Sequence, residues 1–332
     1  MKKIIFVLII ILLLCGCNNN DNQEVVNVLN WSSYIPYDVI TDFQKETGIK
    51  VNYGTYSSNE ELLAKITASR EGTYDLAFPS DYMVKLMIDK KLLEKLDKSK
   101  INNLDKINLQ FLNQSFDYDN DYSLPFLAAT SVLCINRDRI KDDIRNYNDL
   151  LNPKYRNNIV LLDDQRIVIG MALQALEYNM NETVDYVLEK AKNWLIELNP
   201  NVKAFDSDSP KTLLITGEVD IGVIWNAEAT IAKQYNDNIE IIYPEDGFAI
   251  SLDNYTIVKG AKNKDNAYKF IDYILRDDVQ KKITEEYPYI STTINNMSLS
   301  HDELDYILKN GSYVLNVGQN ISKFDKVWAQ IK

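Results

Sequence analysis

The sequence predicts an α/β protein made of two lobes, on three observations. Short apolar segments alternate with amphipathic helical segments from residue 25 to the end of the chain. An alternation of strand and helix is typical of parallel, doubly wound sheets. The alternation occurs in both halves of the 332 residues, and no proline- or glycine-rich linker separates them. We therefore expect two doubly wound α/β lobes, between which the chain crosses more than once.

The first half carries three strand–helix pairs. Gly48 ends the first expected helix, Ser58 with Glu61 forms a capping box that begins the second, and Pro79 ends the third strand. The strands are expected at residues 25–30, 50–53 and 75–78, and the helices at 37–47, 58–69 and 81–89.

The second half repeats the pattern. Strands are expected at residues 159–162, 220–225, 239–243 and 255–258, and helices at 168–178, 184–198, 210–216, 267–275, 279–285, 302–309 and 322–331. In open α/β sheets, ligands bind beyond the carboxyl ends of the strands. Two such lobes that face each other form a cleft, which can close on a ligand by hinging.

The N-terminus has the pattern of a secretory signal. Lys2 and Lys3 precede an apolar run over residues 4–14, which as a helix would be about 16 Å long, about half the hydrocarbon core of a bilayer. The run ends in Leu-Cys-Gly-Cys, which resembles a lipobox with cleavage before Cys17. We expect a signal peptide at 1–16, acyl chains on Cys17 and a flexible polar tether at 17–24. The alternative is a plain N-terminal membrane helix.

Composition excludes several classes of function. The net charge of -12, which becomes -14 without the two N-terminal lysines, disfavours nucleic acid and favours cations. The chain also has 21 Tyr, 10 Phe and 4 Trp, whose ring faces attract cations. Cys134 lies in an apolar segment and would be the one cysteine left beyond Cys17, so we expect a buried thiol and no disulfide.

Sequence motifs of enzymes are missing. The sequence has one histidine, His301, and contains no G-x-x-x-x-G-K-[ST] phosphate loop, no G-x-S-x-G elbow and no H-E-x-x-H motif. A single histidine without a cysteine partner also makes a zinc site improbable. We therefore expect no enzymatic activity, no cofactor and no metal.

The turns after the expected strands carry aromatic and acidic side chains. Their sequences are NWSSYIP at 30–36, PSDY at 79–82, DDQR at 163–166, WNAE at 225–228, SLDN at 251–254 and YPY at 287–289. Further motifs occur along the chain in a fixed order: ETGIKV at 46–51, SSNEEL at 57–62, YDLAFPSDY at 74–82, LLDD at 161–164, NVKAFDSDSP at 201–210 and GEVDIGVIWN at 217–226. Together with NWSSYIP, this series of motifs resembles the spermidine/putrescine-binding proteins of polyamine ABC transporters. The resemblance runs from about residue 26 to the end.

The resemblance implies a bilobal type II periplasmic-binding-protein fold that holds a polyamine between aromatic walls. Residues 25–130 and about 254–297 would form lobe 1, and residues 131–253 and about 298–332 lobe 2. Glu228 stands where the putrescine-binding branch has an acid. The other implied contacts are Trp31, Tyr34, Ser80 and Tyr82 on one wall, Trp225 and Tyr287 on the other, and Asp164 and Asp253 toward the ammonium groups.

Several positions leave alternatives open. Ile167, Ser251 and Val314 depart from the spermidine-binding pattern, so the choice between spermidine and putrescine stays open. Each candidate also has a purely structural alternative. The tryptophans could be core residues, Ser80 and Asp164 could cap helices, and Glu228 could occupy a first helical turn. We expect Trp194 and Trp328 to serve packing.

The expected function is capture of a polyamine outside the cytoplasm and its delivery to the permease of an ABC transporter. The expected partners are the polyamine, permease subunits and the membrane through Cys17, but no nucleic acid. Three alternatives remain. One is a binding protein for another small organic cation, and another is a secreted glycan hydrolase that uses Asp164 and Asp253 as acid and base. The third is a surface sensor that signals when it has bound its ligand.

Overall fold

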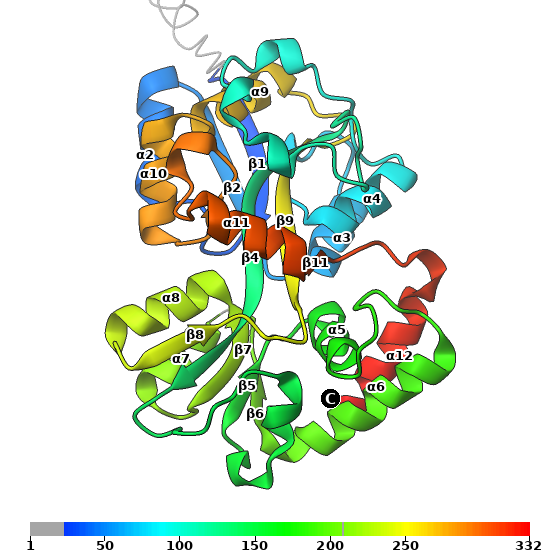
Figure 1. Cartoon of the computed structure of the whole chain (residues 1–332). Helices are drawn as coiled ribbons and strands as arrows, with labels where there is room; N and C mark the ends of the chain where they lie inside the picture. The colour runs from blue at the N-terminus through cyan, green and yellow to red at the C-terminus, as the bar shows by residue number, and fades with distance from the viewer. Residues whose placement is uncertain (1–22, 208) are drawn as a thin grey trace, which may run out of the picture.

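The computed structural model describes residues 23–207 and 209–332. The expected signal peptide, the lipidation site Cys17 and residues 18–22 of the tether lie outside the described residues. Within the described part, the chain forms two α/β lobes, and the long strands β4 and β9 run between them (Figure 1). No helix of the described residues is long and apolar enough to cross a membrane.

Lobe 1 contains a mixed sheet with the strand order β2-β1-β3-β9-β4. Strands β1, β2 and β3 are parallel, as expected, whereas β9 is antiparallel to both β3 and β4. Two short strands extend this sheet, β10 beside β4 and β11 beside β9. The strands are β1 (Val25–Trp31), β2 (Lys50–Tyr56), β3 (Leu76–Ala77), β4 (Ser123–Asn136), β9 (Phe248–Ile257), β10 (Ile290–Ser291) and β11 (Gly311–Tyr313).

Lobe 2 continues the sheet in the order β4-β7-β5-β6, with β8 also paired to β4. Strands β5, β6 and β7 are parallel to one another. Their bounds are Ile159–Leu161 for β5, Val202–Phe205 for β6, Ile221–Trp225 for β7 and Ile239–Ile242 for β8.

Strand β4 belongs to both lobes. Its residues up to Thr130 pair with β9, and from Ser131 onward it pairs with β7. The strand thus changes partners between residues 130 and 131. The division of the chain into the two lobes stays a prediction.

Helices cover the faces of both sheets (Figure 1). In lobe 1 these are α2 (Tyr37–Thr47), α3 (Asn59–Ala68), α4 (Asp81–Asp89), α9 (Lys264–Ile274) and α10 (Asp277–Glu286). In lobe 2 they are α5 (Gln165–Ala175), α6 (Asp185–Leu198), α7 (Pro210–Thr216), α8 (Asn226–Tyr235) and α12 (Ile321–Ile331). Helix α11 (His301–Asn310) packs against β11. Short 3₁₀ turns occupy Lys98–Lys100, Leu104–Lys106, Leu109–Phe111, Tyr147–Leu151, Pro153–Tyr155, Asn199–Asn201, Ile294–Asn296 and Gly318–Asn320.

Local sequence signals fix several helix ends. Ser58 Oγ accepts a hydrogen bond from the Glu61 backbone N–H at 3.1 Å, which confirms the capped start of α3. Gly48 ends α2 with φ at 73°, a left-handed conformation that glycine adopts without strain. Cys134 is fully buried in β4, and burial raises the pKa of its thiol to about 12. The expectation of an inert, buried thiol is therefore confirmed.

Candidate functional site

The carboxyl ends of the parallel strands of both lobes face one cavity. In lobe 1, β1 ends at Trp31, and the chain after β3 leads to Ser80. In lobe 2, β7 ends at Trp225, and the chain after β5 leads to Asp164. Residues from all four ends line a cavity of about 820 Å³, which lies within the size range of small-molecule sites.

Aromatic rings form much of the cavity lining. The Trp31 ring lies 4.7 Å from that of Tyr56 and 6.3 Å from that of Tyr34, and the Tyr34 ring lies 4.6 Å from Tyr289. The indole N–H of Trp31 donates to the carbonyl oxygen of Phe78 at 3.0 Å, which fixes the orientation of its ring. The lining also contains Tyr82, Phe205, Trp225 and Trp328.

Asp253 is the most deeply buried carboxylate of the cavity. It lies on β9, is 3% exposed, and accepts hydrogen bonds from Tyr34 OH at 2.5 Å and Ser80 Oγ at 2.6 Å. Burial raises the pKa of Asp253 to about 6, against the opposing effect of these hydrogen bonds. Among the described residues, no Lys, Arg or His forms an ion pair with it. The site therefore holds a desolvated carboxylate that a ligand cation would stabilise.

A second group of carboxylates comes from both lobes. Asp164 caps α5 by accepting from the backbone N–H groups of Arg166 at 2.8 Å and Ile167 at 3.2 Å. Asp164 thus caps a helix, which is the structural alternative considered for it, and its side chain also lines the cavity. Glu60 accepts from Tyr82 OH at 3.1 Å, and its pKa is raised by burial and by the charge of Asp164. Asp325 of α12 adds a third negative charge that acts on Glu60.

Glu228 lines the cavity from the first turn of α8. Lys211 Nζ donates to both of its carboxylate oxygens, at 2.9 and 2.7 Å. Desolvation nevertheless leaves the pKa of Glu228 raised. The position predicted to face a ligand ammonium is therefore already occupied by an ammonium of the protein itself.

The cavity brings together eight of the nine ligand contacts predicted from the sequence. These are Trp31, Tyr34, Ser80, Tyr82, Asp164, Trp225, Glu228 and Asp253. Tyr287 is not among the lining residues. It packs half-buried against the core of lobe 1, and Tyr289, two residues later, lines the cavity in its place. Tyr287 follows directly after the last residue of α10, and the sequence motif did not indicate which tyrosine of this turn faces the cavity.

Other lining residues were not predicted. Trp328 packs against the core of lobe 2, as expected, with its ring edge-on to Phe205 at 5.3 Å, and it also lines the cavity. Trp194 is buried, as expected. Helical spacing placed both tryptophans beside apolar neighbours, and nothing in that pattern distinguishes a core position from one at the end of a cleft. Ile167, Ser251 and Val314, the three departures from the spermidine-binding pattern, all line the cavity.

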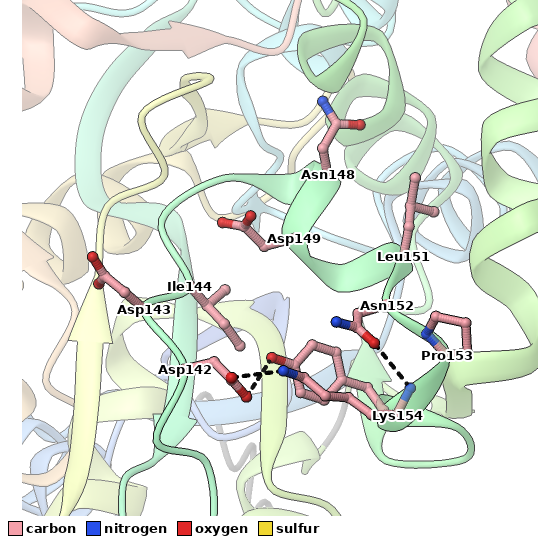
Figure 2. A pocket seen from close by; sticks show the side chains of 10 residues that line it. Asp142, Asp143, Ile144, Asn148, Asp149, Leu151, Asn152, Pro153 and Lys154 are labelled. Carbon is pink, nitrogen blue, oxygen red and sulfur yellow. Dashed lines mark hydrogen bonds and ion pairs between the residues drawn. The ribbon is translucent and has the colours of Figure 1, made fainter.

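A second hollow, of about 650 Å³, lies on the surface of lobe 2 (Figure 2). All of its lining residues come from the segment 142–155. Its central carboxylate, Asp142, is already paired with Lys154 at 2.6 Å and accepts from Tyr155 OH at 3.0 Å. The hollow has neither the two-lobed lining nor the unpaired buried carboxylate of the cavity at Asp253.

Comparisons with known proteins agree with this geometry. Residues 38–304 match the family of bacterial extracellular solute-binding proteins. The chain is 36% identical over 322 residues to the spermidine/putrescine-binding periplasmic protein of Escherichia coli (strain K12), covering 94% of this chain and 92% of that protein. The name of the relative places it in the periplasm, and the name of the family describes its members as extracellular.

Solved structures share the fold. A putative spermidine/putrescine ABC transporter from Listeria monocytogenes superimposes with a TM-score of 0.87 at 32% identity, covering 93% of this chain and 98% of that one. The Tp0655 (TpPotD) lipoprotein of Treponema pallidum gives a TM-score of 0.85 at 27% identity, covering 93% and 99%. The expected bilobal periplasmic-binding-protein fold is thus confirmed, and the chain belongs to the bacterial extracellular solute-binding proteins related to spermidine/putrescine-binding proteins.

Proposed function

We propose that the chain captures a polyamine, spermidine or putrescine, in the cleft between its lobes and delivers it to the permease of an ABC transporter. The observation that carries the proposal is the composition of the cavity lining. Seven carboxylates line it, and none of its described lining residues is Lys, Arg or His. The seven are Glu60, Asp163, Asp164, Asp206, Glu228, Asp253 and Asp325.

The chemistry of a polyamine suits this lining. Its methylenes pack against ring faces, and each ammonium combines a carboxylate with a neighbouring ring. A desolvated cation–π contact contributes about 2 kcal/mol, and a hydrogen bond to a charged group about 1.5–3 kcal/mol. Among the predicted contacts, Trp31, Tyr34, Ser80 and Asp253 form one such group. Tyr82, Asp164 and Trp225 supply the rest of the lining that we propose contacts the ligand.

Names of the relatives support the ligand and the transport role. The Escherichia coli relative is a spermidine/putrescine-binding protein, and the Listeria structure is described as an ABC transporter component for the same compounds. We infer that the present chain is the binding component and has no enzymatic activity of its own. Hinging at β4 and β9, the two long strands between the lobes, would close the cleft around the ligand.

Lipid anchoring is a further part of the proposal. The lipobox-like sequence before Cys17 supports acylation of that cysteine after cleavage of residues 1–16. The structurally similar Treponema pallidum protein is described as a lipoprotein. More than one acyl chain on Cys17 would hold the protein stably at the membrane, next to its permease.

Calorimetric titration of a form lacking residues 1–17 tests the function. Putrescine, spermidine and spermine are titrated beside a small cation such as choline and an uncharged diol of similar length. At least one polyamine should bind with one site per chain and a Kd below about 100 μM, about -5.5 kcal/mol. If choline alone binds, the protein serves another organic cation. Release of sugar from a glycan mixture would support the hydrolase alternative, and no polyamine binding at all would refute the proposal.

A further inference from the structure

Both carboxylate oxygens of Glu228 contact a cation of the protein. Lys211 Nζ lies 2.9 Å from Oε1 and 2.7 Å from Oε2. Glu228 is only 8% exposed, and Lys211 is not among the residues that line the cavity. The ammonium therefore reaches the carboxylate from α7, behind the wall that α8 forms.

Three other acids of the cavity differ in this respect. Asp253, Asp164 and Glu60 form hydrogen bonds to hydroxyl or backbone donors, and none of the three has an ion pair with a described Lys, Arg or His. They keep their negative charge available to a ligand. The cavity thus contains carboxylates that a ligand can neutralise, beside Glu228, which Lys211 neutralises, and Asp163, which pairs with Lys332.

A primary ammonium of a polyamine and the ammonium of a lysine are the same chemical group. Both place up to three N–H donors around one positive charge, and both are satisfied by the same two carboxylate oxygens. A ligand ammonium that approached Glu228 would meet a carboxylate whose charge is cancelled and a like charge a few ångströms away, which repels it.

We propose that Lys211 determines specificity in the cleft, because its ammonium holds the place on Glu228 that one more ammonium of the ligand would take. The inference rests on the proposed function and deepens it. Lys211 limits the number of ammonium groups that the cleft can neutralise, which favours polyamines with fewer amines over those with more. Removal of the lysine charge should open an additional ammonium subsite at Glu228.

The test is a double-substitution cycle read by calorimetric titration with putrescine and spermine. The proteins compared are the unaltered chain, Lys211→Met, Glu228→Gln and the combination of both. Lys211→Met should bind spermine at least about tenfold more tightly and raise the ratio of spermine to putrescine affinity about fivefold or more. Glu228→Gln should weaken both ligands, because it leaves the lysine charge unpaired beside the cleft. The combined variant, which has no charged group at either position, should return to within about threefold of the unaltered protein.

A matched control separates the local effect from net charge. Lys233→Met, on the exposed side of α8, changes the net charge by the same amount and should leave the affinity ratio unchanged. Thermal melting without ligand shows whether each variant is folded, and the charge-free combined variant keeps the test valid if Lys211→Met alone does not fold.

Three outcomes overturn the inference. One is an unchanged affinity ratio in Lys211→Met, and another is an equal rise of the ratio in the Lys233→Met control. The third is a combined variant that binds as weakly as Glu228→Gln, which would mean that Glu228 contacts the ligand directly. If the unaltered protein binds no polyamine, the proposed function fails and the inference falls with it. Polyamine binding with any of the three outcomes leaves the function in place and refutes the role of Lys211 alone.

Discussion

Ser80 Oγ donates a hydrogen bond of 2.6 Å to Asp253 Oδ1, joining segments of the chain that lie 173 residues apart. Tyr34 OH donates to the other carboxylate oxygen at 2.5 Å. The two hydroxyl groups fix the orientation of the carboxylate without neutralising it, and each oxygen can accept a further donor. Asp253 is therefore an oriented anion that can accept an N–H of a ligand.

Substitution of Asp253 by Asn should remove most of the polyamine affinity. The amide keeps the shape of the side chain and can still bond to Ser80 and Tyr34, but it cannot neutralise an ammonium. We expect the Kd for the preferred polyamine to rise roughly 30-fold, about 2 kcal/mol, in calorimetric titration. Asp89→Asn, an exposed acid at the end of α4, serves as the control and should leave the Kd unchanged.

The same substitution should change how the stability of the ligand-free protein depends on pH. The pKa of Asp253 is raised to about 6 by burial, above its ordinary value near 4, so the folded state holds this proton more tightly than the unfolded state. The protonated Asp253 carboxyl group therefore stabilises the folded state at low pH. This contribution approaches its full value below about pH 4 and is lost as the pH rises through 6.

Relative to Asp253→Asn, the unaltered protein should therefore lose about 2.4 kcal/mol of unfolding free energy between pH 4 and pH 7. Urea denaturation of both proteins at pH 4, 5, 6 and 7 measures the difference. Parallel pH profiles would contradict a raised pKa at this position.

Ligand binding should release protons near pH 6. An ammonium beside Asp253 lowers its pKa, so carboxyl groups that are protonated in the free protein ionise on binding. We expect release of about half a proton per ligand at pH 6 and about 0.1 at pH 7. Titration in two buffers with different ionisation enthalpies gives this number, and binding without release at pH 6 would show that the ammonium lies elsewhere.

Tyr289 should matter more to ligand binding than Tyr287. The ring of Tyr289 lines the cavity 4.6 Å from Tyr34, whereas Tyr287 packs outside it. Tyr289→Leu should weaken polyamine binding about tenfold through loss of a ring face, and Tyr287→Leu should change it less than about threefold. Both variants replace a tyrosine with a leucine, so the two changes in side chain are the same. A larger effect at Tyr287 would show that Tyr287 contacts the ligand, as the sequence motif predicts, and not Tyr289.

Arg166 should contribute to stability rather than to binding. Arg166 is 1% exposed, and its guanidinium donates to the Leu315 carbonyl and to Asn181 Oδ1 at 2.9 Å each and lies 4.6 Å from the centre of the Phe324 ring. Arg166→Met leaves both acceptors without this donor, which should cost about 2–4 kcal/mol of unfolding free energy. Urea denaturation measures the loss, and the exposed Arg156→Met is the matched control, expected to change stability by less than about 0.5 kcal/mol.

Many helices could be predicted from the sequence, because capping residues mark the ends of a helix and hydrophobic periodicity marks its buried face. The bounds of α2, α4 and α7 are those expected from the sequence. The long strand β4 was missed. Every residue of Ser123–Asn136 is buried, so the strand shows no alternation of polar and apolar side chains, and Pro125 interrupts its pattern. The structure accommodates this proline next to an irregularity in the β4–β9 register.

The candidate site was predictable to the extent that it lies at strand ends. Trp31, Ser80, Asp164 and Trp225 each follow a recognisable strand, and the cavity brings them together. Contacts between distant segments of the chain produce no recognisable pattern in the local sequence. Nothing near Glu228 indicates that Lys211, 17 residues earlier, neutralises it, because that pairing depends on how α7 packs against α8.

The placement of β9 has a consequence for the order in which the protein folds. This strand lies between β3 and β4 in the sheet of lobe 1, although it begins 171 residues after β3 ends in the sequence. The N-terminal lobe therefore cannot complete its core until residue 257 has been synthesised, and its long-range pairing makes folding slow. A chain that stays unfolded until late in synthesis remains competent for threading through a membrane translocation channel, as export from the cytoplasm requires.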